Sequence, residues 1–540
     1  MLSTPRTHVW MLCLVTLPPM ASVYLLKNSH YDLSTPNLLV HLVILALWLF
    51  SMNNIVYEHY FGPLSDVPMA GGDWFVLGHT PYIFGNIQGL PYLKLVNNMK
   101  LDHRGVFRVK GIFHLGGQLV LTAPETINEA LNSHCYDYVK PPKPIAFLSR
   151  IIGNGLIASE MAEHKAQRKA VWPAFQGHMI RELVPDMWRK SFEFADVIAS
   201  ETDRETAMLE FNGIVSRATL DIIGVSAFGK DFQTLYNSDN RLASVYKKAF
   251  DPTPDIIRYF ATSMVLPSFM GPWIPMSGNR KITVDSMVMK EQCAQLIAEN
   301  RAALKESGDG RPDILSLLLK TDLSDEEILD QMLTFLGAGH ETTSSASTFA
   351  VYLLATHPDI QHRVRKEVRE TLSKYRPEEL TMQVLDSMPY LAAVASEALR
   401  VWPTVPVTSR VAVKQTTIAG LNIPPGTHVS IAPITIHRLE SLWGKDALVF
   451  NPDRWLDPSN TVPGGSTHPL AYIPFLTGPR ACIGQVFAKA EMRCLLATYV
   501  ERFQFEMFDP NEELSVAGVI TIKPRELKLR ITDLGSSLKA

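Results

Sequence analysis

The sequence is poor in cysteine. Its 540 residues contain five cysteines and no CxxC pair, and the five are scattered: Cys13, Cys135, Cys293, Cys482 and Cys494. Disulfide scaffolds and structural zinc sites need cysteines in pairs at short spacing, so we expect neither. The sequence also lacks an excess of basic residues, because its formal net charge is −3. A protein whose main partner is nucleic acid carries a strongly positive face, and we therefore expect no nucleic-acid partner.

Several common catalytic motifs are missing or incomplete. In "HETTS", His340 and Glu341 have no second histidine at the spacing that a zinc-binding helix requires. Gly337 and Gly339 have no third glycine at the spacing of a dinucleotide-binding loop, and no strand precedes them. Neither a Gly-x-Ser-x-Gly elbow nor a phosphate-binding loop occurs in the sequence. These observations exclude the most familiar hydrolase and nucleotide-binding signatures.

Apolar residues are abundant, at 46% of the chain, and two apolar runs lie near its start, at 9–26 and 38–56. Each run approaches the roughly 20 residues that span a bilayer. We expect a membrane anchor at residues 1–60 with one or two transmembrane helices, and a cleaved signal peptide is the alternative. Arg6 and Lys27 flank the first run, and no basic residue follows before Lys94. The charges therefore do not fix the topology.

The rest of the chain has the pattern of one large domain. The stretch "FGPLSDVPMAGG" at 61–72 is rich in proline and glycine and predicts a stiff hinge. No low-complexity linker or internal repeat divides residues 73–540. Helical patterns dominate 160–400, while alternation with Gly and Pro punctuation predicts strands within 417–431. The predicted fold is mostly α with a minor β portion, in a single large domain.

One predicted helix has an unusual centre. Ser324 and Glu327 have the spacing of a capping box, and the apolar pattern that follows continues to about residue 357. The middle of this helix reads "FLGAGHETTSSAS" (335–347). A glycine there costs about 1 kcal/mol relative to alanine, and buried polar groups cost more unless they are paired. This composition indicates that something other than protein approaches the helix at its centre.

The strongest chemical signal is the loop that begins "FLTGPRACIGQVF" at Phe475. Cys482 lies directly before an amphipathic helix, where the helix dipole and free N–H groups favour a thiolate. Thiolates are soft ligands that suit iron. Gly478 and Gly484 would let the backbone pass close to a flat cofactor, and Arg480 would supply a cation for its carboxylates. The loop therefore predicts an iron cofactor bound through sulfur.

With this loop, the chain resembles the cytochrome P-450 family, the haem-thiolate monooxygenases, over roughly residues 60–530. Further motifs carry the resemblance: the E-x-x-R pair Glu397 and Arg400, "FNPDRW" with Arg454, "AGHETT" at 338–343, "HKAQRKAVWPAF" at 164–175 with Arg168, and Arg410 after Pro406. The sequence departs from the pattern at two places. His164 stands where many members have tryptophan, and Asp453 and Trp455 replace glutamate and phenylalanine.

The resemblance implies a site built around haem b. Cys482 would be the axial thiolate ligand, within a cofactor-binding loop that also includes Phe475, Gly478, Arg480 and Gly484. The haem propionates would be bound by Arg168 and Arg410, with His164 as a further donor.

The resemblance also assigns roles to residues away from that loop. Glu397, Arg400 and Arg454 would form a network that steadies the cysteine loop. Ala338 and Gly339 would open a groove for dioxygen. Glu341 and Thr342 would be the catalytic residues that supply protons.

The implied activity is insertion of one oxygen atom from dioxygen into a lipophilic substrate, with electrons from NADPH through NADPH-cytochrome P-450 reductase. The general character of the sequence resembles fungal enzymes of secondary metabolism, anchored in the endoplasmic reticulum with the catalytic domain facing the cytosol. The alternatives are a haem-thiolate isomerase or dehydratase that needs no external electrons, and a haem-binding sensor. The intact Glu341–Thr342 pair favours the monooxygenase, because proton delivery is its expected task.

Two further stretches bear on partners. The apolar, proline-punctuated segment 248–275 is expected to cover the substrate pocket near the membrane. Basic residues on two predicted helices are expected to guide the reductase to the haem's proximal face: Lys165, Arg168, Lys169, Lys489 and Arg493.

Overall fold

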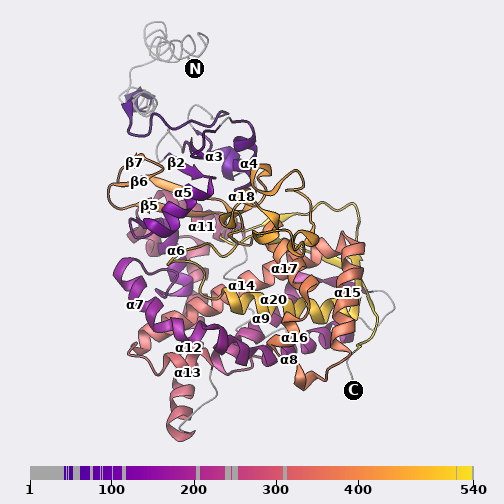
Figure 1. Ribbon diagram of the computed structural model, residues 1–540. Coiled ribbons are helices and arrows are strands. Elements are labelled where there is room, and N and C mark those ends of the chain that lie inside the picture. The colour runs from indigo at the N-terminus through magenta and orange to yellow at the C-terminus, as the bar shows by residue number, and fades with distance from the viewer. Residues whose placement is uncertain are drawn as a thin grey trace, which may run out of the picture.

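The computed structural model (Figure 1) describes residues 42–43, 45–46, 48–50, 52, 61–72, 77–84, 87, 89–99, 101–111, 117–201, 207–237, 245, 253–307, 313–518 and 520–537. The predicted anchor at 1–60 lies almost wholly outside these residues, and so does the choice between one span and two. Within the described residues, no helix combines the length and the hydropathy needed to cross a bilayer. The stretch 61–72 forms turns and one isolated bridge from Met69 to Arg108.

Helices make up most of the described chain, as predicted. The long helices are α6 (Pro142–Ile152), α7 (Met161–Val171), α8 (Gly177–Glu201), α9 (Phe211–Phe228), α11 (Pro254–Val265), α12 (Ser277–Ser307), α14 (Asp325–Ala355), α15 (Pro358–Leu372), α17 (Pro389–Val401) and α20 (Gln485–Arg502). The shorter α-helices are α3 (Thr80–Phe84), α4 (Leu90–Asn97), α5 (Pro124–Asn128), α13 (Ile314–Leu318), α16 (Met382–Asp386), α18 (Pro433–Ile436) and α19 (Glu440–Trp443). Short helical turns of other types are η3 (Glu129–Ser133), η4 (Trp172–Phe175), η5 (Ser268–Trp273), η6 (Pro377–Glu379), η7 (Pro452–Trp455), η8 (Pro463–Gly465) and η9 (Pro469–Ala471).

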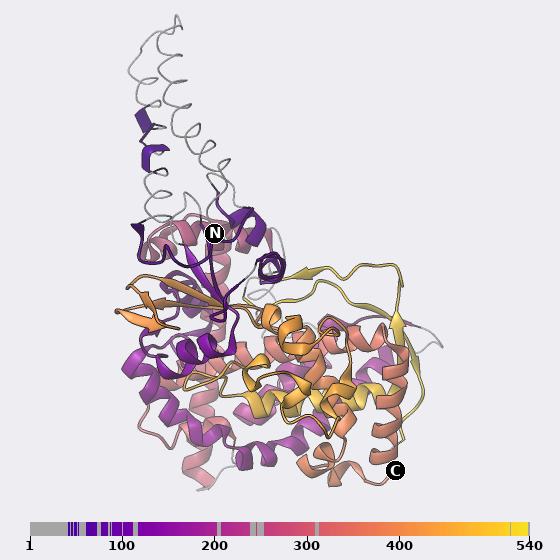
Figure 2. The same ribbon diagram turned by 45° about the horizontal axis from the view of Figure 1, so that its top comes forward.

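The strands form small sheets at the edge of the helical body (Figures 1 and 2). The largest has the order β1-β2-β8-β5-β3 and contains β1 (Val106–Val109), β2 (Gln118–Leu121), β3 (Tyr138–Val139), β5 (Thr408–Ala412) and β8 (His428–Ile431). Its strands pair antiparallel except for β2 with β8. The others are β4-β12-β9, β10-β11 and β6-β7, from β4 (Ala207–Glu210), β6 (Thr416–Ile418), β7 (Leu421–Ile423), β9 (Phe503–Met507), β10 (Val516–Ala517), β11 (Lys523–Pro524) and β12 (Lys528–Asp533).

The strands predicted within 417–431 are present as β6, β7 and β8. Ala419 and Gly420 form the turn between β6 and β7, and both have positive φ, 48° and 75°. Two central residues with positive φ match the twist of a tight hairpin, which is why glycine is suited to this turn.

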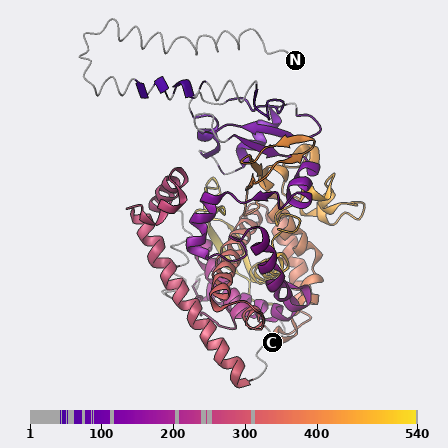
Figure 3. The ribbon, with the colours of Figure 1, turned by 90° about the vertical axis from the view of Figure 1, so that its left-hand side faces the viewer.

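Helix α14 is the element that organises the site. Its N-terminus has the predicted capping box, in which Ser324 Oγ accepts from Glu327 N at 3.3 Å and Glu327 Oε2 accepts from Ser324 N at 2.8 Å. Along its length α14 packs against α9 and also contacts α20, the helix that follows the cysteine loop. Figure 3 shows α12 as a long rod along the outside of this body.

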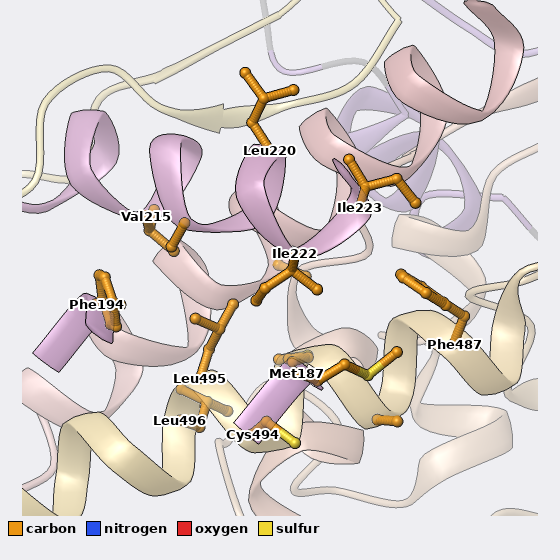
Figure 4. Close-up of a cluster of buried hydrophobic side chains, with 14 of the residues drawn as sticks. Met187, Phe194, Val215, Leu220, Ile222, Ile223, Phe487, Cys494, Leu495 and Leu496 are labelled. Atoms are coloured by element: carbon orange, nitrogen blue, oxygen red, sulfur yellow. The ribbon is translucent and has the colours of Figure 1, made fainter. Parts of the chain in front are cut away.

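The main hydrophobic core lies between these helices (Figure 4). Met187 and Phe194 of α8, Ile222 of α9 and Leu495 and Leu496 of α20 are each at most 2% exposed. Because fully burying one such side chain contributes about 1.5–3 kcal/mol, this cluster holds α20, and with it the cysteine loop, in a fixed place.

Candidate functional site

The cysteine loop is closed by its own backbone. Cys482 N donates to the Phe475 carbonyl at 2.9 Å, and Ala481 N donates to the Gly478 carbonyl at 3.0 Å. Gly478 has a φ of 82°, and a Cβ there would lie 2.2 Å from the Leu131 carbonyl oxygen. Glycine is therefore required because η3 approaches the loop closely, which differs from the predicted reason, passage beside a cofactor. Gly484 does have open space, since a Cβ there would meet protein only at 4.0 Å.

The Cys482 side chain is accessible and yet lies deep in the protein. Burial raises the pKa of its thiol, against the opposing effects of the Gly484 N–H group and the Arg168 charge. Without a bound metal, the prediction that the helix terminus favours the Cys482 thiolate is therefore wrong. The helix α20 begins only at Gln485, and desolvation of the thiol has a larger effect on its pKa than the N–H group does. A bound metal cation deprotonates a coordinating thiol by itself, so this pKa does not oppose metal binding.

A second accessible surface lies at the centre of α14. Ala338, Gly339 and Thr342 are partly exposed, whereas neighbours such as His340 and Thr343 are buried. Residues at i and i+4 share a helix face, so Ala338 and Thr342 lie together. Thr342 Oγ1 donates to the Ala338 carbonyl at 2.6 Å. The centre of α14 therefore has a small, partly exposed patch between buried neighbours, and a groove for dioxygen at this place stays a prediction.

Gly339 has a second reason to be small. A Cβ at this position would lie 3.1 Å from Cδ1 of Ile223, which belongs to α9. Real Cβ atoms rarely tolerate so close a contact, so glycine allows α9 and α14 to pack closely. The residue therefore serves helix packing as well as the groove that the sequence predicted.

Glu341 is 4% exposed, and its Oε1 lies 3.1 Å from Lys523 Nζ on β11. This partner could not be predicted from the sequence, because the two residues are far apart along the chain. His340 is also buried, with its Nε2 2.7 Å from the Ser216 hydroxyl. Burial, with a smaller effect of the Lys523 charge, lowers the pKa of His340 to about 3, so this histidine is neutral in the working range.

The three arginines predicted to bind the cofactor carboxylates lie in one cationic cluster. Arg480 donates to the Tyr138 carbonyl at 3.0 Å and forms an ion pair with Glu160. Glu160 also pairs with Lys140, at 3.2 Å. Arg410 is 5% exposed, and Nη1 donates to its own neighbours, Thr408 Oγ1 and the Ser409 carbonyl, both at 2.8 Å.

This cluster carries more positive charge than negative charge. Burial, with the nearby Arg480 charge, lowers the pKa of Lys140 to about 8 and that of Arg410 to about 10. Arg168 is directed to the Ala481 carbonyl at 2.8 Å, beside the cysteine. Against these cations, one carboxylate among the described residues pairs at close range, Glu160. A buried excess of positive charge is costly unless an anion compensates it. The residues present therefore fit a cofactor that combines a thiolate-binding metal with carboxylate groups, as haem b does.

His164 lies buried beside Tyr136. It is 3% exposed, and its Nδ1 lies 3.3 Å from the Tyr136 hydroxyl. Burial and the charges of Arg480, Lys140 and Arg168 lower its pKa to about 4. The neutral ring retains one N–H group, so donation to a propionate stays a prediction.

The predicted Glu-Arg-Arg network is present. Arg400 is fully buried and uses all five of its N–H groups. Two of them bind both oxygens of Glu397, each at 2.8 Å. The other three donate to the carbonyls of His437, Ala447 and Val449 at 2.6–2.8 Å. Arg400 thereby fixes the loop segment that precedes the cysteine loop.

The departure at Trp455 extends this network. Arg454 Nε donates to Glu397 Oε1 at 3.0 Å, and Trp455 Nε1 donates to Glu397 Oε2 at 2.9 Å. Phenylalanine could not make the second bond. The other departure, Asp453, points outward and pairs with Arg363 at 2.7 Å. The Glu397 carboxylate thus gains a donor through Trp455.

Sequence reasoning missed His437. Its Nε2 accepts from Ile473 N at 2.9 Å, so the proton must be on Nδ1, which donates to the Arg400 carbonyl at 3.0 Å. Burial, with the Arg400 charge, lowers the pKa of His437 to about 3. The His437 ring therefore links the arginine network to the segment at Ile473, which leads into the cysteine loop. A histidine next to an arginine in "IHRLE" gave no signal for this role.

The chain matches one known protein family and several curated proteins. The sequence model of the family described as Cytochrome P-450 matches residues 79–530. Among curated proteins, the chain is 35% identical to the cytochrome P-450 monooxygenase sphH of Aspergillus fumigatus, with 87% of this chain and 88% of the relative covered. It is 33% identical to the monooxygenase FUM15 of Gibberella moniliformis, with 86% of each covered. It is 32% identical to the monooxygenase ALT8 of Alternaria alternata, with 87% of this chain and 89% of the relative covered.

Proposed function

The chain belongs to the cytochrome P-450 family and is a haem-thiolate monooxygenase, and on this premise we propose that it oxidises a lipophilic substrate in fungal secondary metabolism with electrons from NADPH. Its partners are a small-molecule substrate, dioxygen and a redox protein, which we propose to be NADPH-cytochrome P-450 reductase. The relatives named above are monooxygenases of fungi, and this supports the proposed setting.

Haem b, when bound, supplies an iron at which dioxygen is reduced and split, so that one oxygen atom enters the substrate and the other leaves as water. Cys482 would hold the iron, in a loop whose shape is set by the bonds to Phe475 and Gly478. Arg168, Arg410 and Arg480 would hold the carboxylates.

The protein must also deliver protons to the site while it keeps bulk water out. Phe335 of α14 and Phe175 of η4 are buried with their ring centres 5.0 Å apart, so this part of the helix is surrounded by apolar side chains. Glu341 provides an ionisable group and Thr342 a hydroxyl on the accessible face. A helix that keeps an acid and an alcohol at this point is the observation that favours a monooxygenase over an isomerase or dehydratase, which needs no such protons.

The redox partner would meet a surface that differs from the predicted one. Lys165 and Lys169 are exposed on α7 and can meet an acidic partner. Arg493, by contrast, pairs with Asp386 at 3.0 Å, and Lys489 is half-buried with its Nζ 5.6 Å from the centre of the Phe475 ring. Arg168 points inward to the cysteine loop. We therefore assign the steering charge to Lys165 and Lys169 and not to the pair on α20.

A lipophilic substrate and a location at the endoplasmic reticulum, with the catalytic domain facing the cytosol, are further parts of the proposal. The described part of the segment predicted to cover the pocket forms α11 and η5, and it carries large apolar side chains at the surface. Val265, Phe269 and Trp273 are 77%, 77% and 82% exposed. An exposed apolar group of this kind fits contact with lipid, from which an apolar substrate would enter.

One experiment separates the three candidate functions. The haem-loaded full-length chain is reconstituted with NADPH-cytochrome P-450 reductase, and NADPH oxidation and product are measured over a set of lipophilic substrates. Oxygenated product that requires NADPH supports the proposal. Turnover of a substrate without NADPH would instead identify an isomerase or dehydratase. Haem binding with no turnover of either kind across the set would identify a sensor.

A further inference from the structure

The ion pair between Glu341 and Lys523 places a cation next to the predicted proton path. The Lys523 side chain is 22% exposed and that of Glu341 is 6% exposed, so the lysine forms the solvent-side end of the pair. Opposite charges at 3.1 Å in a partly buried place favour the ionised form of both groups. Lys523 therefore keeps a carboxylate ionised near the centre of α14.

The backbone on both sides of Lys523 is fixed. Ile522 N donates to the Thr404 carbonyl at 2.9 Å, and the Pro524 carbonyl accepts from Asn212 Nδ2 at 2.6 Å. Ile522 itself is 3% exposed and packs with Phe349 of α14. The lysine thus projects from a short strand that is anchored to three other parts of the protein, and this anchoring gives Glu341 a defined partner.

Helix geometry places Glu341 beside the accessible face. At 100° per residue, Glu341 lies about 60° to one side of Ala338, and Thr342 lies about 40° to the other. Thr342 Oγ1 donates its proton to the Ala338 carbonyl, which leaves its lone pairs able to accept. The carboxylate and the hydroxyl therefore flank the same open patch.

We propose that Lys523 is a positioning residue for proton delivery, holding the ionised Glu341 between solvent and Thr342. The inference rests on the proposed monooxygenase function and deepens it. A proton taken from solvent binds a carboxylate oxygen of Glu341 and then leaves it beside Thr342, toward the oxygen atom that departs as water. Lys523 keeps its own proton and charge throughout, so Glu341 returns to the carboxylate after each transfer.

Other ionisable groups near the pair do not take over this role. His340 is neutral and directed to Ser216 of α9. Glu491 of α20 lies across the helix next to Thr343, and burial raises its pKa well above the usual range, so it carries no charge to offset Lys523. Lys523 is therefore the charged group that sets the state of Glu341 in this part of the described structure.

The test uses the haem-loaded full-length chain with Lys523→Met, Lys523→Arg and, as a matched control, Lys528→Met. Lys528 forms an ion pair of similar length, 2.9 Å with Glu526, but at the surface of the neighbouring strand, with side chains 38% and 63% exposed. In Lys523→Met we expect an additional infrared carbonyl band of a protonated carboxyl group at neutral pH, beside the band that protonated Glu491 gives in every variant. The additional band is absent from the wild type and from Lys523→Arg, and Glu341→Gln in the Lys523→Met background removes it.

Turnover gives the second measurement. The acidic limb of the pH profile for product formed per NADPH oxidised should move to higher pH by about 1–3 units in Lys523→Met, because a neighbouring opposite charge shifts a carboxyl by that amount. Lys523→Arg should restore the wild-type limb, and Lys528→Met should leave it unchanged.

The outcomes separate the inference from the function on which it rests. An unchanged pH limb in Lys523→Met, or no new carboxyl band, overturns the role of Lys523 while the monooxygenase function stands. Failure of the wild type to oxygenate any substrate overturns the proposed function, and the infrared band still decides whether Lys523 sets the state of Glu341. A loss of folding in Lys523→Met is recognised by far-UV circular dichroism, and Lys523→Gln then replaces it in both measurements.

Discussion

Trp455→Phe restores the residue that the family pattern has at this place, and we expect it to destabilise the protein. The change removes the hydrogen bond from Trp455 Nε1 to Glu397 Oε2 at 2.9 Å. Glu397 is fully buried, so the lost donor cannot be replaced by bulk water. A hydrogen bond to a charged group contributes about 1.5–3 kcal/mol.

Packing adds a smaller cost to this substitution. The Trp455 ring lies 4.7 Å from the Tyr472 ring and 6.2 Å from the Trp443 ring, and phenylalanine keeps part of these contacts. The remaining bonds of Glu397, from Arg400, Arg454 and the Asn451 N–H group, keep the carboxylate paired. We therefore expect the free energy of unfolding to fall by about 2–3 kcal/mol, mostly through the lost bond.

Trp443→Phe is the matched control. Trp443 is 3% exposed, and its indole nitrogen has no hydrogen-bond partner within the described part of the chain, so this change removes ring area without removing a bond. Urea unfolding of the haem-loaded wild type and both variants is followed by far-UV circular dichroism. If Trp455→Phe costs no more than Trp443→Phe, the reasoning is refuted, and Trp455 is only a packing residue.

Three further predictions concern the site. Cys482→His should abolish the strongly red-shifted Soret band of the reduced carbon monoxide complex, and persistence of that band would assign the sulfur ligand to another cysteine. Thr342→Ala should cost at most about 1–2 kcal/mol of stability, because its hydroxyl binds only within its own helix, but the ratio of product to NADPH oxidised should fall far more than in Thr343→Ala. Equal ratios in the two variants would remove Thr342 from the proton path. Glu491→Gln should stabilise the protein increasingly as pH rises above about 4.5, because burial raises the pKa of Glu491 and the folded state holds a proton that the unfolded state has lost. Below the unfolded pKa both states are protonated, and above it the wild type loses about 1.4 kcal/mol per pH unit until the folded pKa is reached. Unfolding curves of both proteins at several pH values check this, and parallel pH dependences would contradict a proton on Glu491.

The parts of the site that sequence could predict are those encoded within one short segment. The cysteine loop, the "AGHETT" helix and the Glu397–Arg400 pair each place their residues within a few positions, where helix and turn geometry decide the arrangement. The fold class followed from the same local periodicities. Lys523 and His437 could not be found in this way, because their roles arise only when distant segments pack together.

Glycines show a second limit. The sequence predicted room for a cofactor at Gly478 and for dioxygen at Gly339, and the structure shows protein groups close to both: the Leu131 carbonyl and Ile223. A glycine in a sequence indicates that space is needed, but it does not identify the group that occupies the space. The thiol of Cys482 shows a third limit, since the helix dipole is visible in a sequence and the opposing desolvation is not.

The five bonds of Arg400 also bear on how the chain folds during synthesis. Its acceptors, and the residues that join it on Glu397, lie up to 58 positions along the chain from Glu397, ending with the Arg454–Trp455 turn of η7. Chains leave the ribosome from the N-terminus, so α17 emerges with its arginine unpaired and acquires partners one segment at a time. The last of them, Trp455, emerges before Cys482 does. The Glu397–Arg400–Arg454 network can therefore be complete when Cys482 first appears, and the cysteine loop then needs only the later packing of α20 to be held in place.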